Sequence, residues 1–342
     1  MPTATQTREF RDCVLNSRAV SLVDNDQALG LHQHIADRPA TALDKVANNV
    51  CSYRAIFACS ISFHFGHNLM NETGRMWALL DSNLMQNIDA IVVAVQFPGS
   101  VFEILTPEQW CKLETRHHPV IQWMLTLLST LPIATSKSVI LTSGQTRFDS
   151  LLLPTRVLHA GWHPDMVNFE AMQSVYHAIR DSISNPLPAV RPRVYISRRQ
   201  FDDQTRAQLV KNPSSKHVNL RICENEQAFE EELTKRGFVV HTFENLSSKD
   251  QIKIAGQSSV LMSLGGSGLH HSCFCQREGH LISLGDFRWV NAEGEPNGNQ
   301  SLMNRMVPGL KCSFIKMRVT SSDDIFYSLD LPYTLAQIDK IL

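Results

Sequence analysis

Apolar runs of strand length alternate with amphipathic stretches along most of the chain. In the second half these runs predict four strands, at Val194–Ile196, Phe238–Phe243, Val260–Leu264 and His280–Leu284. Helices are predicted between them at 225–236, with Gly237 as the C-cap, and at 247–256, with Ser247 as the N-cap. Alternating strands and helices are typical of a parallel sheet with both faces covered. We therefore predict a doubly wound α/β domain.

The first half shows the same alternation and predicts a second domain of this type. Its predicted strands are Arg54–Ser60, Asp89–Gln96, Ser138–Thr142 and Leu151–Pro154. Helices are expected from Leu69 onward, within 107–131 and around 165–184, whereas residues 1–50 are weakly patterned and favour a hairpin or short helices.

Three prolines within Ser184–Arg193 mark the boundary between the two halves. We predict an N-terminal Rossmann-like domain over residues 1–184 and a C-terminal one over 185–310. The segment 311–342 is expected to return to the N-terminal domain.

Composition excludes several classes of protein. A chain of 342 residues with 43% hydrophobic and 19% charged residues is long enough for two folded domains. A net charge of −1 and a pI near 6.9 are not typical of a nucleic-acid-binding protein. The sequence has neither the apolar core of a signal peptide nor a run long enough to span a membrane, so we expect a cytoplasmic protein with at most a peripheral membrane contact. Its eight scattered cysteines do not form a disulfide pattern.

A glycine turn follows the predicted strand Val260–Leu264. It consists of Gly265, Gly266, Ser267 and Gly268. An apolar segment that begins with Leu269 and His270 follows the turn. Glycines permit positive φ and remove the Cβ atoms that would obstruct a ligand, and a helix that starts there directs its N–H groups at an anion. By itself such a turn is equally consistent with a purely geometric role.

Other polar residues are predicted at the same edge of the sheet. Arg198 and Arg199 follow one strand and Glu244 follows the next. Because ligands of doubly wound sheets bind at the carboxyl ends of the strands, we expect these side chains near a ligand. Arginines suit a diphosphate, and a carboxylate suits the hydroxyls of a ribose. Without a ligand, the two arginines would be an ordinary surface pair.

A second polar group precedes the predicted helix of the first half. It contains His64, His67, Asn71, Glu72 and Arg75. In an α-helix, His67, Asn71 and Arg75 would share one face because they are four residues apart. We interpret this group as a wall of a site rather than as a solvated face.

Zinc binding is an alternative that the sequence also raises. Histidines and cysteines occur close together in His64 and His67, in His270 and His271, and in Cys273 and Cys275. None of these pairs has the spacing of a well-formed zinc site, so we favour a chain without a metal. His270 or His271 would then line the donor pocket.

Taken together, the motifs resemble glycosyltransferase family 61. The similar segments are YISRR at 195–199, RICENEQAFEEEL at 221–233, GFVVHTFENLSSKDQI at 237–252, VLMSLGGSGLHHSCF at 260–274 and GHNLMNETGRMWALL at 66–80. His67 and Arg75 match the family's histidine and arginine. The resemblance extends over residues 54–290.

The resemblance implies a GT-B architecture of two Rossmann-like domains that face a central cleft. It also implies an inverting transfer, without a metal or other cofactor, from a nucleotide sugar to a glycan or glycolipid, as in bacterial cell-surface polysaccharide synthesis. A UDP-sugar is the expected donor, bound by the second domain. We assign His67 as the general base, with Glu72 as the second choice, and we place His64 and Arg75 beside the acceptor.

The sequence departs from the family pattern at two positions. The family's turn reads His-Gly-Ala-Gly-Leu, whereas Gly265 stands in the place of the histidine, and Asn71 replaces the usual acidic residue. If either position is catalytic, the alternative is a catalytically silent nucleotide-sugar-binding or scaffold homologue.

Overall fold

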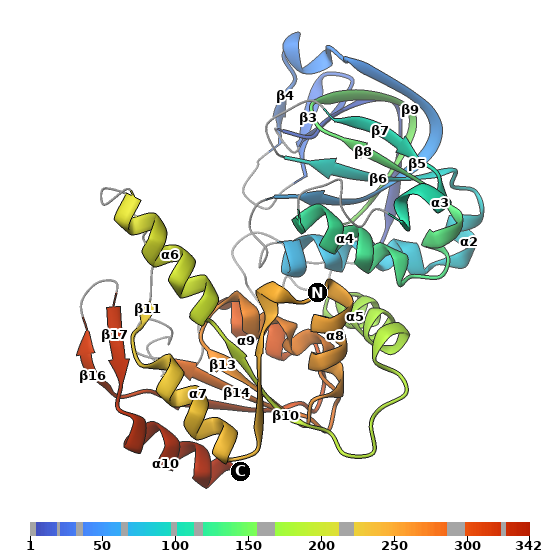
Figure 1. The fold of residues 1–342 in the computed structure, drawn as a ribbon. Coiled ribbons are helices and arrows are strands. Elements are labelled where there is room, and N and C mark those ends of the chain that lie inside the picture. Colours follow the sequence, from blue (N-terminus) through green and yellow to red (C-terminus); the bar gives the residue numbers. More distant parts are fainter. Residues whose placement is uncertain are drawn as a thin grey trace. The chain divides into compact units, whose positions relative to one another are not determined.

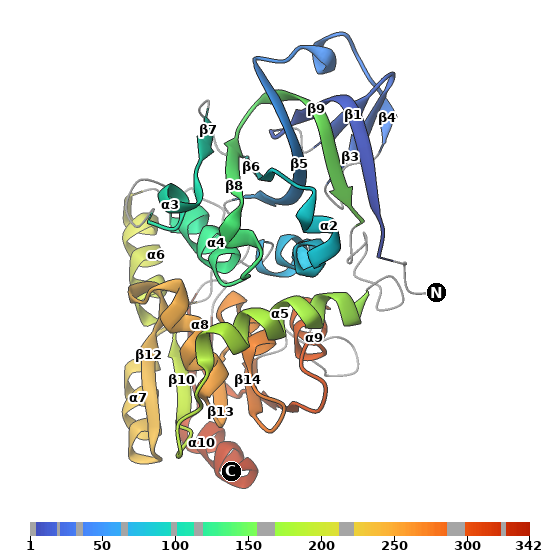
Figure 2. The same ribbon diagram turned by 90° about the vertical axis from the view of Figure 1, so that its right-hand side faces the viewer.

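We examined a computed structural model of the chain. It describes residues 5–18, 21–31, 37–62, 68–96, 101–112, 119–155, 168–211, 222–285, 298–322 and 326–342. Contacts divide the chain into two compact units, 1–183 and 184–342, which are coloured blue to green and green to red in Figures 1 and 2. Each unit contains its own sheet and is described by itself.

The first unit has a mixed sheet in the order β4-β3-β2-β1-β9-β5-β6-β8-β7. β5, β6, β8 and β9 are parallel, whereas β1 to β4 form antiparallel hairpins and β7 is antiparallel to β8. The strands are β1 Thr7–Asn16, β2 Ser21–Asp24, β3 Gln27–Gly30, β4 Arg38–Pro39, β5 Asn49–Ile61, β6 Ala90–Val95, β7 Phe102–Leu105, β8 Ser138–Thr142 and β9 Gln145–Pro154.

The expectation of a wholly parallel sheet in this unit is therefore wrong. Of the strands in this sheet, only β6 is buried along its whole length, as a central parallel strand should be. In the first half of β1, by contrast, Phe10 is the only buried residue. The four predicted strands of the first half are confirmed as β5, β6, β8 and the end of β9. The described part of residues 1–50 contains antiparallel strand pairs and one short helix, which are the structures that we expected there.

The helices of the first unit connect these strands. They are η1 Leu43–Lys45, η2 Asn68–Glu72, η3 Thr73–Leu80, α2 Ser82–Gln86, α3 Pro107–Trp110, α4 Pro119–Ser129, η4 Ala134–Ser136 and α5 Phe169–Ser184. η2 is a π-helical turn and η3 is a 3₁₀ helix, so the predicted helix from Leu69 is not an α-helix.

The second unit has a five-stranded parallel sheet in the order β12-β10-β13-β14-β15. Its strands are β10 Arg193–Ser197, β12 Phe238–Thr242, β13 Val260–Leu264, β14 His280–Gly285 and β15 Lys311–Lys316. After β10 the chain continues to β12 on one side, and after β13 it continues to β14 on the other. The strand order therefore reverses between β10 and β13, which is the topological switch point where doubly wound sheets bind their ligands.

Helices and a small second sheet complete this unit. They are α6 Arg199–Lys211, α7 Glu226–Lys235, η6 Phe243–Asn245, α8 Ser248–Gln257, η7 Ser267–Phe274, α9 Gly298–Asn304 and α10 Leu331–Ile341, with β11 Ile222–Cys223, β16 Val319–Ser322 and β17 Phe326–Leu329. The predicted caps are confirmed: Gly237 has a φ of +80°, and Ser247 Oγ accepts a hydrogen bond from Asp250 N at 3.2 Å.

The segment 311–342 packs within the second unit rather than returning to the first. β15 extends the parallel sheet, and β17 pairs with β11. Leu335 and Ile338 of α10 join the same buried cluster as Phe229 and Leu233 of α7, together with Tyr195 of β10. The two helices therefore cover one face of this sheet.

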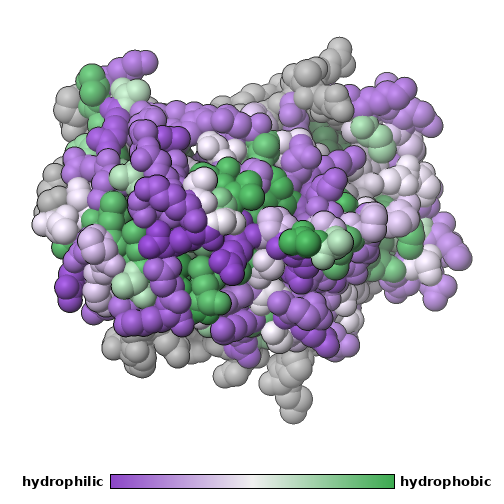
Figure 3. Space-filling model, turned by 60° about the horizontal axis from the view of Figure 1, so that its bottom comes forward, coloured by the Kyte–Doolittle hydropathy of each residue, from purple (hydrophilic) through white to green (hydrophobic). Residues whose placement is uncertain are grey.

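The surface gives no sign of a membrane-spanning helix. Within the described ranges, no helix is both long and apolar enough to cross a bilayer. On the face shown in Figure 3, small groups of hydrophobic residues lie among hydrophilic ones.

The core of the second unit yields a first prediction. The Phe229 ring is fully buried and contacts the Tyr195 ring edge to face, with centroids 5.5 Å apart. We expect Phe229→Ala to lower the free energy of unfolding by about 3–5 kcal/mol, because it removes a buried aromatic side chain and leaves a cavity. Val210→Ala on α6, whose side chain is exposed, should change it by less than about 0.5 kcal/mol. Urea unfolding measures both, and equal effects would contradict the packing described here.

Candidate functional site

The candidate site lies at the carboxyl ends of β10 and β13. Arg198 and Arg199 follow β10, and the glycine turn that begins with Gly265 follows β13. The two strands are adjacent and parallel, with Ile196 opposite Ser263. The switch point therefore places the predicted arginines beside the predicted turn, although 66 residues of sequence separate Arg199 from Gly265.

Arg198 bridges the two strand ends. Its Nη1 donates a hydrogen bond to the carbonyl oxygen of Gly265 at 2.8 Å, and its Nη2 lies 3.6 Å from Asp202 Oδ1. Only 16% of its side chain is exposed. The guanidinium is therefore already engaged by the protein, and we interpret Arg198 as the residue that fixes the turn against β10.

Gly266 makes room for this guanidinium. Its φ of +155° and ψ of 178° lie in a region that is essentially restricted to glycine. A Cβ atom at this position would overlap Arg198 Nη1. We predicted that the turn needs glycine so that a ligand can approach, and the structure adds that an arginine side chain needs it too.

Arg199 is held differently from its neighbour. Its side chain is 47% exposed and its Nη2 lies 3.2 Å from Glu230 Oε2. A half-exposed guanidinium with a single ion pair can turn to an incoming oxyanion at little energetic cost. Of the two predicted arginines, Arg199 is therefore the better candidate for a diphosphate ligand.

A group of buried acids lies behind the arginines, and the sequence did not reveal it. Asp202, Glu226 and Glu230 are all buried. Glu226 Oε1 accepts hydrogen bonds from the Tyr195 hydroxyl at 2.7 Å and from Arg198 N at 2.9 Å, whereas Oε2 is buried without a hydrogen-bond partner. Burial raises the pKa of Glu226 to about 7, with smaller effects from its acidic neighbours. In the sequence Glu226 looked like an ordinary acid in the first turn of a helix, and nothing indicated its burial.

The glycine turn itself is accessible and leads into η7. Ser267 is exposed, and Gly265, Gly266 and Gly268 are half-buried. The N–H groups of Ser267 and Gly268 belong to the first turn of η7 and have no acceptor within it, so they are suited to bind an anion. Leu269 is buried in the core, so it supports the turn and does not line a pocket.

The two adjacent histidines are both buried within η7. His271 Nδ1 lies 2.9 Å from the Gly268 oxygen and His271 Nε2 lies 3.0 Å from Gln251 Oε1, and burial lowers the pKa of His271 to about 4. His271 therefore supports the turn from within the core.

His270 is oriented by Gln300 of α9. The Gln300 Nε2 donates to Leu269 O and to Asn304 Oδ1, so its Oε1 faces His270 Nδ1 at 3.0 Å. His270 Nδ1 accordingly carries the proton in this contact. Gln300 is a residue that sequence reasoning missed.

Glu244 lies at the same edge of the sheet but one strand further out. It is exposed in η6, directly after β12, and β12 pairs with β10 on the side away from β13. Its position is compatible with the predicted contact to a ribose.

One of the predicted residues of the first unit, Glu72, lies near the carboxyl end of β5. His64 and His67 are outside the described residues, as is the side chain of Asn71. Glu72 is buried, and its Oε2 accepts a hydrogen bond from Ser60 N at 2.7 Å. Trp77 Nε1 donates to Thr155 O at 3.1 Å, just after β9. η2 and η3 are therefore tied to the ends of β5 and β9, where the strand order of this sheet also reverses.

The expected α-helical face of His67, Asn71 and Arg75 does not form, because the segment from residue 68 to 80 is not an α-helix. The Asn68 side chain forms hydrogen bonds with both the backbone N–H and the carbonyl oxygen of Ser62. The Thr73 hydroxyl donates a hydrogen bond to the Asn68 carbonyl oxygen. These side-chain bonds compete with the regular backbone pattern. Arg75 is buried: it donates to Leu31 O at 2.8 Å and lies 5.1 Å from the centroid of the Phe57 ring. Its position is that of a structural residue.

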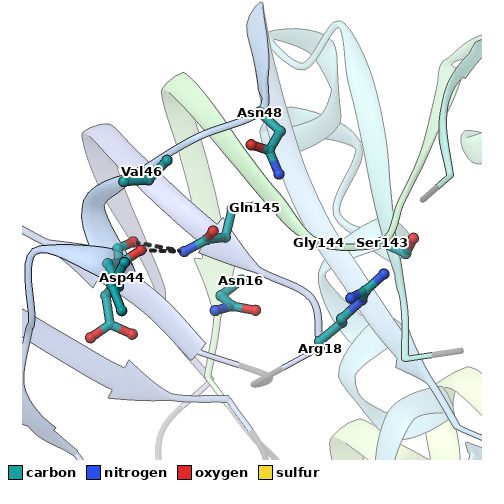
Figure 4. A pocket seen from close by; sticks show the side chains of 9 residues that line it. Asn16, Arg18, Asp44, Val46, Asn48, Ser143, Gly144 and Gln145 are labelled. Carbon is teal, nitrogen blue, oxygen red and sulfur yellow. Dashed lines mark hydrogen bonds between the residues drawn. The ribbon is translucent and has the colours of Figure 1, made fainter. Parts of the chain in front are cut away.

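A hollow in the first unit lies away from all of these residues. It is lined by Asn16, Arg18, Leu43, Asp44, Val46, Asn48, Ser143, Gly144 and Gln145 (Figure 4). Gln145 donates to the Leu43 and Asp44 carbonyls at its side. The hollow lies at the amino ends of β5 and β9 and beside Ser143 and Gly144, which follow β8. None of the predicted site residues that the structure describes lines it, so we do not assign the site to it.

Among the residues that the structure describes, no three histidines, cysteines or acids are grouped so that they could hold a metal ion. Cys273 and Cys275 are buried, and burial raises the pKa of Cys273 well above its usual range. The thiolate form that zinc requires is therefore disfavoured at Cys273.

A comparison with known families identifies the class of protein. Residues 65–282 match the model of Glycosyltransferase 61, and no curated protein matches the chain. The matched region contains η2 and η3 of the first unit and the switch point of the second. The chain belongs to glycosyltransferase family 61, and this membership implies glycosyltransferase activity.

The overlap at Gly266 can be tested by a double-mutant cycle. Gly266→Ala should destabilise the protein by about 1–3 kcal/mol through its φ alone, and by more because of Arg198. In an Arg198→Ala background the second contribution should disappear, so the two substitutions should be non-additive by more than about 0.5 kcal/mol. Gly237→Ala, at a positive φ with no atom within 4 Å of the added Cβ, is the matched control and should be additive. Additivity at Gly266 would contradict the contact.

The buried Glu226 predicts a pH dependence of stability. An acid whose pKa is higher in the folded than in the unfolded protein binds an extra proton when folded, so it lowers stability as pH rises between about 4.5 and 7. Glu226→Gln keeps an oxygen for Tyr195 and Arg198 but cannot ionise. We expect the free energy of unfolding of Glu226→Gln to increase relative to that of the unsubstituted protein as the pH rises from 5 to 8. Parallel pH profiles from urea titrations would show that Glu226 does not titrate in this range.

Proposed function

We propose that this glycosyltransferase is an inverting, metal-independent enzyme of the GT-B type that uses a nucleoside diphosphate sugar, with a UDP-sugar as the first candidate. The donor binds at the switch point of the second unit. A hydroxyl of a glycan or glycolipid, bound by the first unit, is the acceptor. The biological setting we propose is cell-surface polysaccharide synthesis on the cytoplasmic side of the membrane.

The arrangement between β10 and β13 carries this proposal. Arg199, the first-turn amides of η7 and the positive end of its dipole meet at one sheet edge, and all three favour an anion with several oxygens. Glu244 is the candidate acceptor of ribose hydroxyl bonds. These groups supply the charge that a departing diphosphate needs, so the proposal requires no divalent cation.

The chemistry is a single displacement. The acceptor oxygen attacks the anomeric carbon while the bond from that carbon to the diphosphate oxygen breaks, and the nucleoside diphosphate leaves with the electron pair. A general base takes the proton of the acceptor hydroxyl, and we assign this role to His67, next to η2. Glu72 is less suited as the base because it is buried and one of its oxygens is occupied by Ser60 N.

Two variants should separate donor binding from catalysis. Arg199→Ala should weaken UDP binding by about 10-fold or more, because it removes a charge-assisted contact to the diphosphate. His67→Ala should lower the rate of transfer by about 100- to 10,000-fold and leave UDP binding unchanged. Binding is measured by thermal shift in EDTA and in Mg²⁺, and transfer by release of UDP with an acceptor library.

Lys211→Ala, at the far end of α6, is the control for Arg199→Ala and should affect neither measurement. Stabilisation by UDP without transfer to any acceptor would favour the silent homologue. No stabilisation by any nucleoside diphosphate, with or without Mg²⁺, would overturn the donor site.

A further inference from the structure

Phe201 is an exposed aromatic residue beside the candidate donor site. It is the third residue of α6, and 46% of it is exposed to solvent. Single exposed apolar side chains are common on protein surfaces, so exposure alone does not indicate a role. The position of the ring relative to the switch point is the informative observation.

The Phe201 ring contacts Arg198, and Arg198 contacts the glycine turn. The Arg198 guanidinium carbon is 5.4 Å from the centroid of the Phe201 ring, and Nη1 of the same guanidinium bonds to the Gly265 carbonyl at 2.8 Å. The guanidinium that contacts the turn therefore also packs against the Phe201 ring. Phe201 is therefore positioned at the switch point and still has nearly half of its surface open.

An aromatic ring with nearly half of its surface exposed is suited to stacking against a second planar group. Nucleobases stack on aromatic side chains, and a neighbouring guanidinium adds to the attraction of such a surface. The groups that we proposed to bind the diphosphate are Arg199 and the amides of Ser267 and Gly268. They lie at the same edge of the sheet. Because Arg199 and Phe201 are both in the first turn of α6, a nucleotide whose diphosphate binds Arg199 can place its base against Phe201.

We propose that Phe201 is the platform on which the nucleobase of the donor stacks. This inference rests on the proposed function, because it takes the donor to be a nucleotide. Stacking is tolerant of the base that is bound, so Phe201 would supply affinity for the nucleoside part, and other contacts would select among bases.

The test compares a ligand that has a nucleoside with one that has none. UDP and inorganic diphosphate share the phosphate groups, but only UDP can stack on the ring. Isothermal titration calorimetry is carried out on the full chain and on Phe201→Leu, Phe201→Tyr and Val210→Ala. Leucine keeps apolar bulk without an aromatic face, tyrosine keeps the face, and Val210 is an 82% exposed position on the same helix.

We expect Phe201→Leu to weaken UDP binding by about 5- to 100-fold and to leave diphosphate binding unchanged. Phe201→Tyr and Val210→Ala should bind both ligands as the unsubstituted protein does. GDP and CDP should lose affinity in Phe201→Leu by a factor similar to that for UDP.

Three results would overturn the inference. Equal UDP affinity of Phe201→Leu and the unsubstituted protein would show that the ring does not contact the nucleoside. An equal loss for UDP and diphosphate would show that Phe201 acts only by holding Arg198. If the unsubstituted protein bound neither ligand, the proposed donor site would fail and the platform with it, whereas the first two results leave the donor site intact.

Discussion

The contact of Arg198 with the glycine turn is the interaction on which the candidate site depends. It joins the ends of two parallel strands at the one place in the second sheet where the chain order reverses. The contact needs a glycine at position 266, because the guanidinium occupies the space that a side chain would fill. Asp202 lies beside the same guanidinium, with its Oδ1 3.6 Å from Nη2, and Glu226 accepts a hydrogen bond from the Arg198 backbone N–H. An arginine that has only 16% of its side chain exposed and is held by these contacts gives the turn a fixed shape before any ligand arrives.

This arrangement divides the work between two adjacent residues. Arg198 is engaged by the protein, whereas Arg199 is 47% exposed and is restrained by an ion pair with Glu230. The same logic applies to the histidines, because His271 is enclosed in the core and His270 is oriented by Gln300. Neighbours of identical type therefore have different partners and different roles.

Much of the second unit could be predicted from the sequence, because its strands are continuous apolar runs and its helices have clear caps such as Ser247 and Gly237. The common location of Arg198, Arg199 and the turn at one edge of the sheet could also be predicted, because each of them follows a strand of a parallel sheet. The buried acids could not be predicted, since Glu226 looks like any first-turn acid until the fold brings it against Tyr195. The mixed sheet of the first unit was missed because β1 to β4 are short or half-exposed, and the π turn at 68–72 arises from side-chain bonds of Asn68 and Thr73 that no periodicity reveals.

Hydrogen–deuterium exchange with and without UDP tests the central claim most directly, because it locates the bound nucleotide without any substitution. The account predicts slower exchange in peptides that contain residues 195–203 and 263–272, with little change elsewhere in the second unit. Protection of the hollow around Asn16, Asn48 and Gln145, with none at the switch point, would contradict the assignment of the donor site.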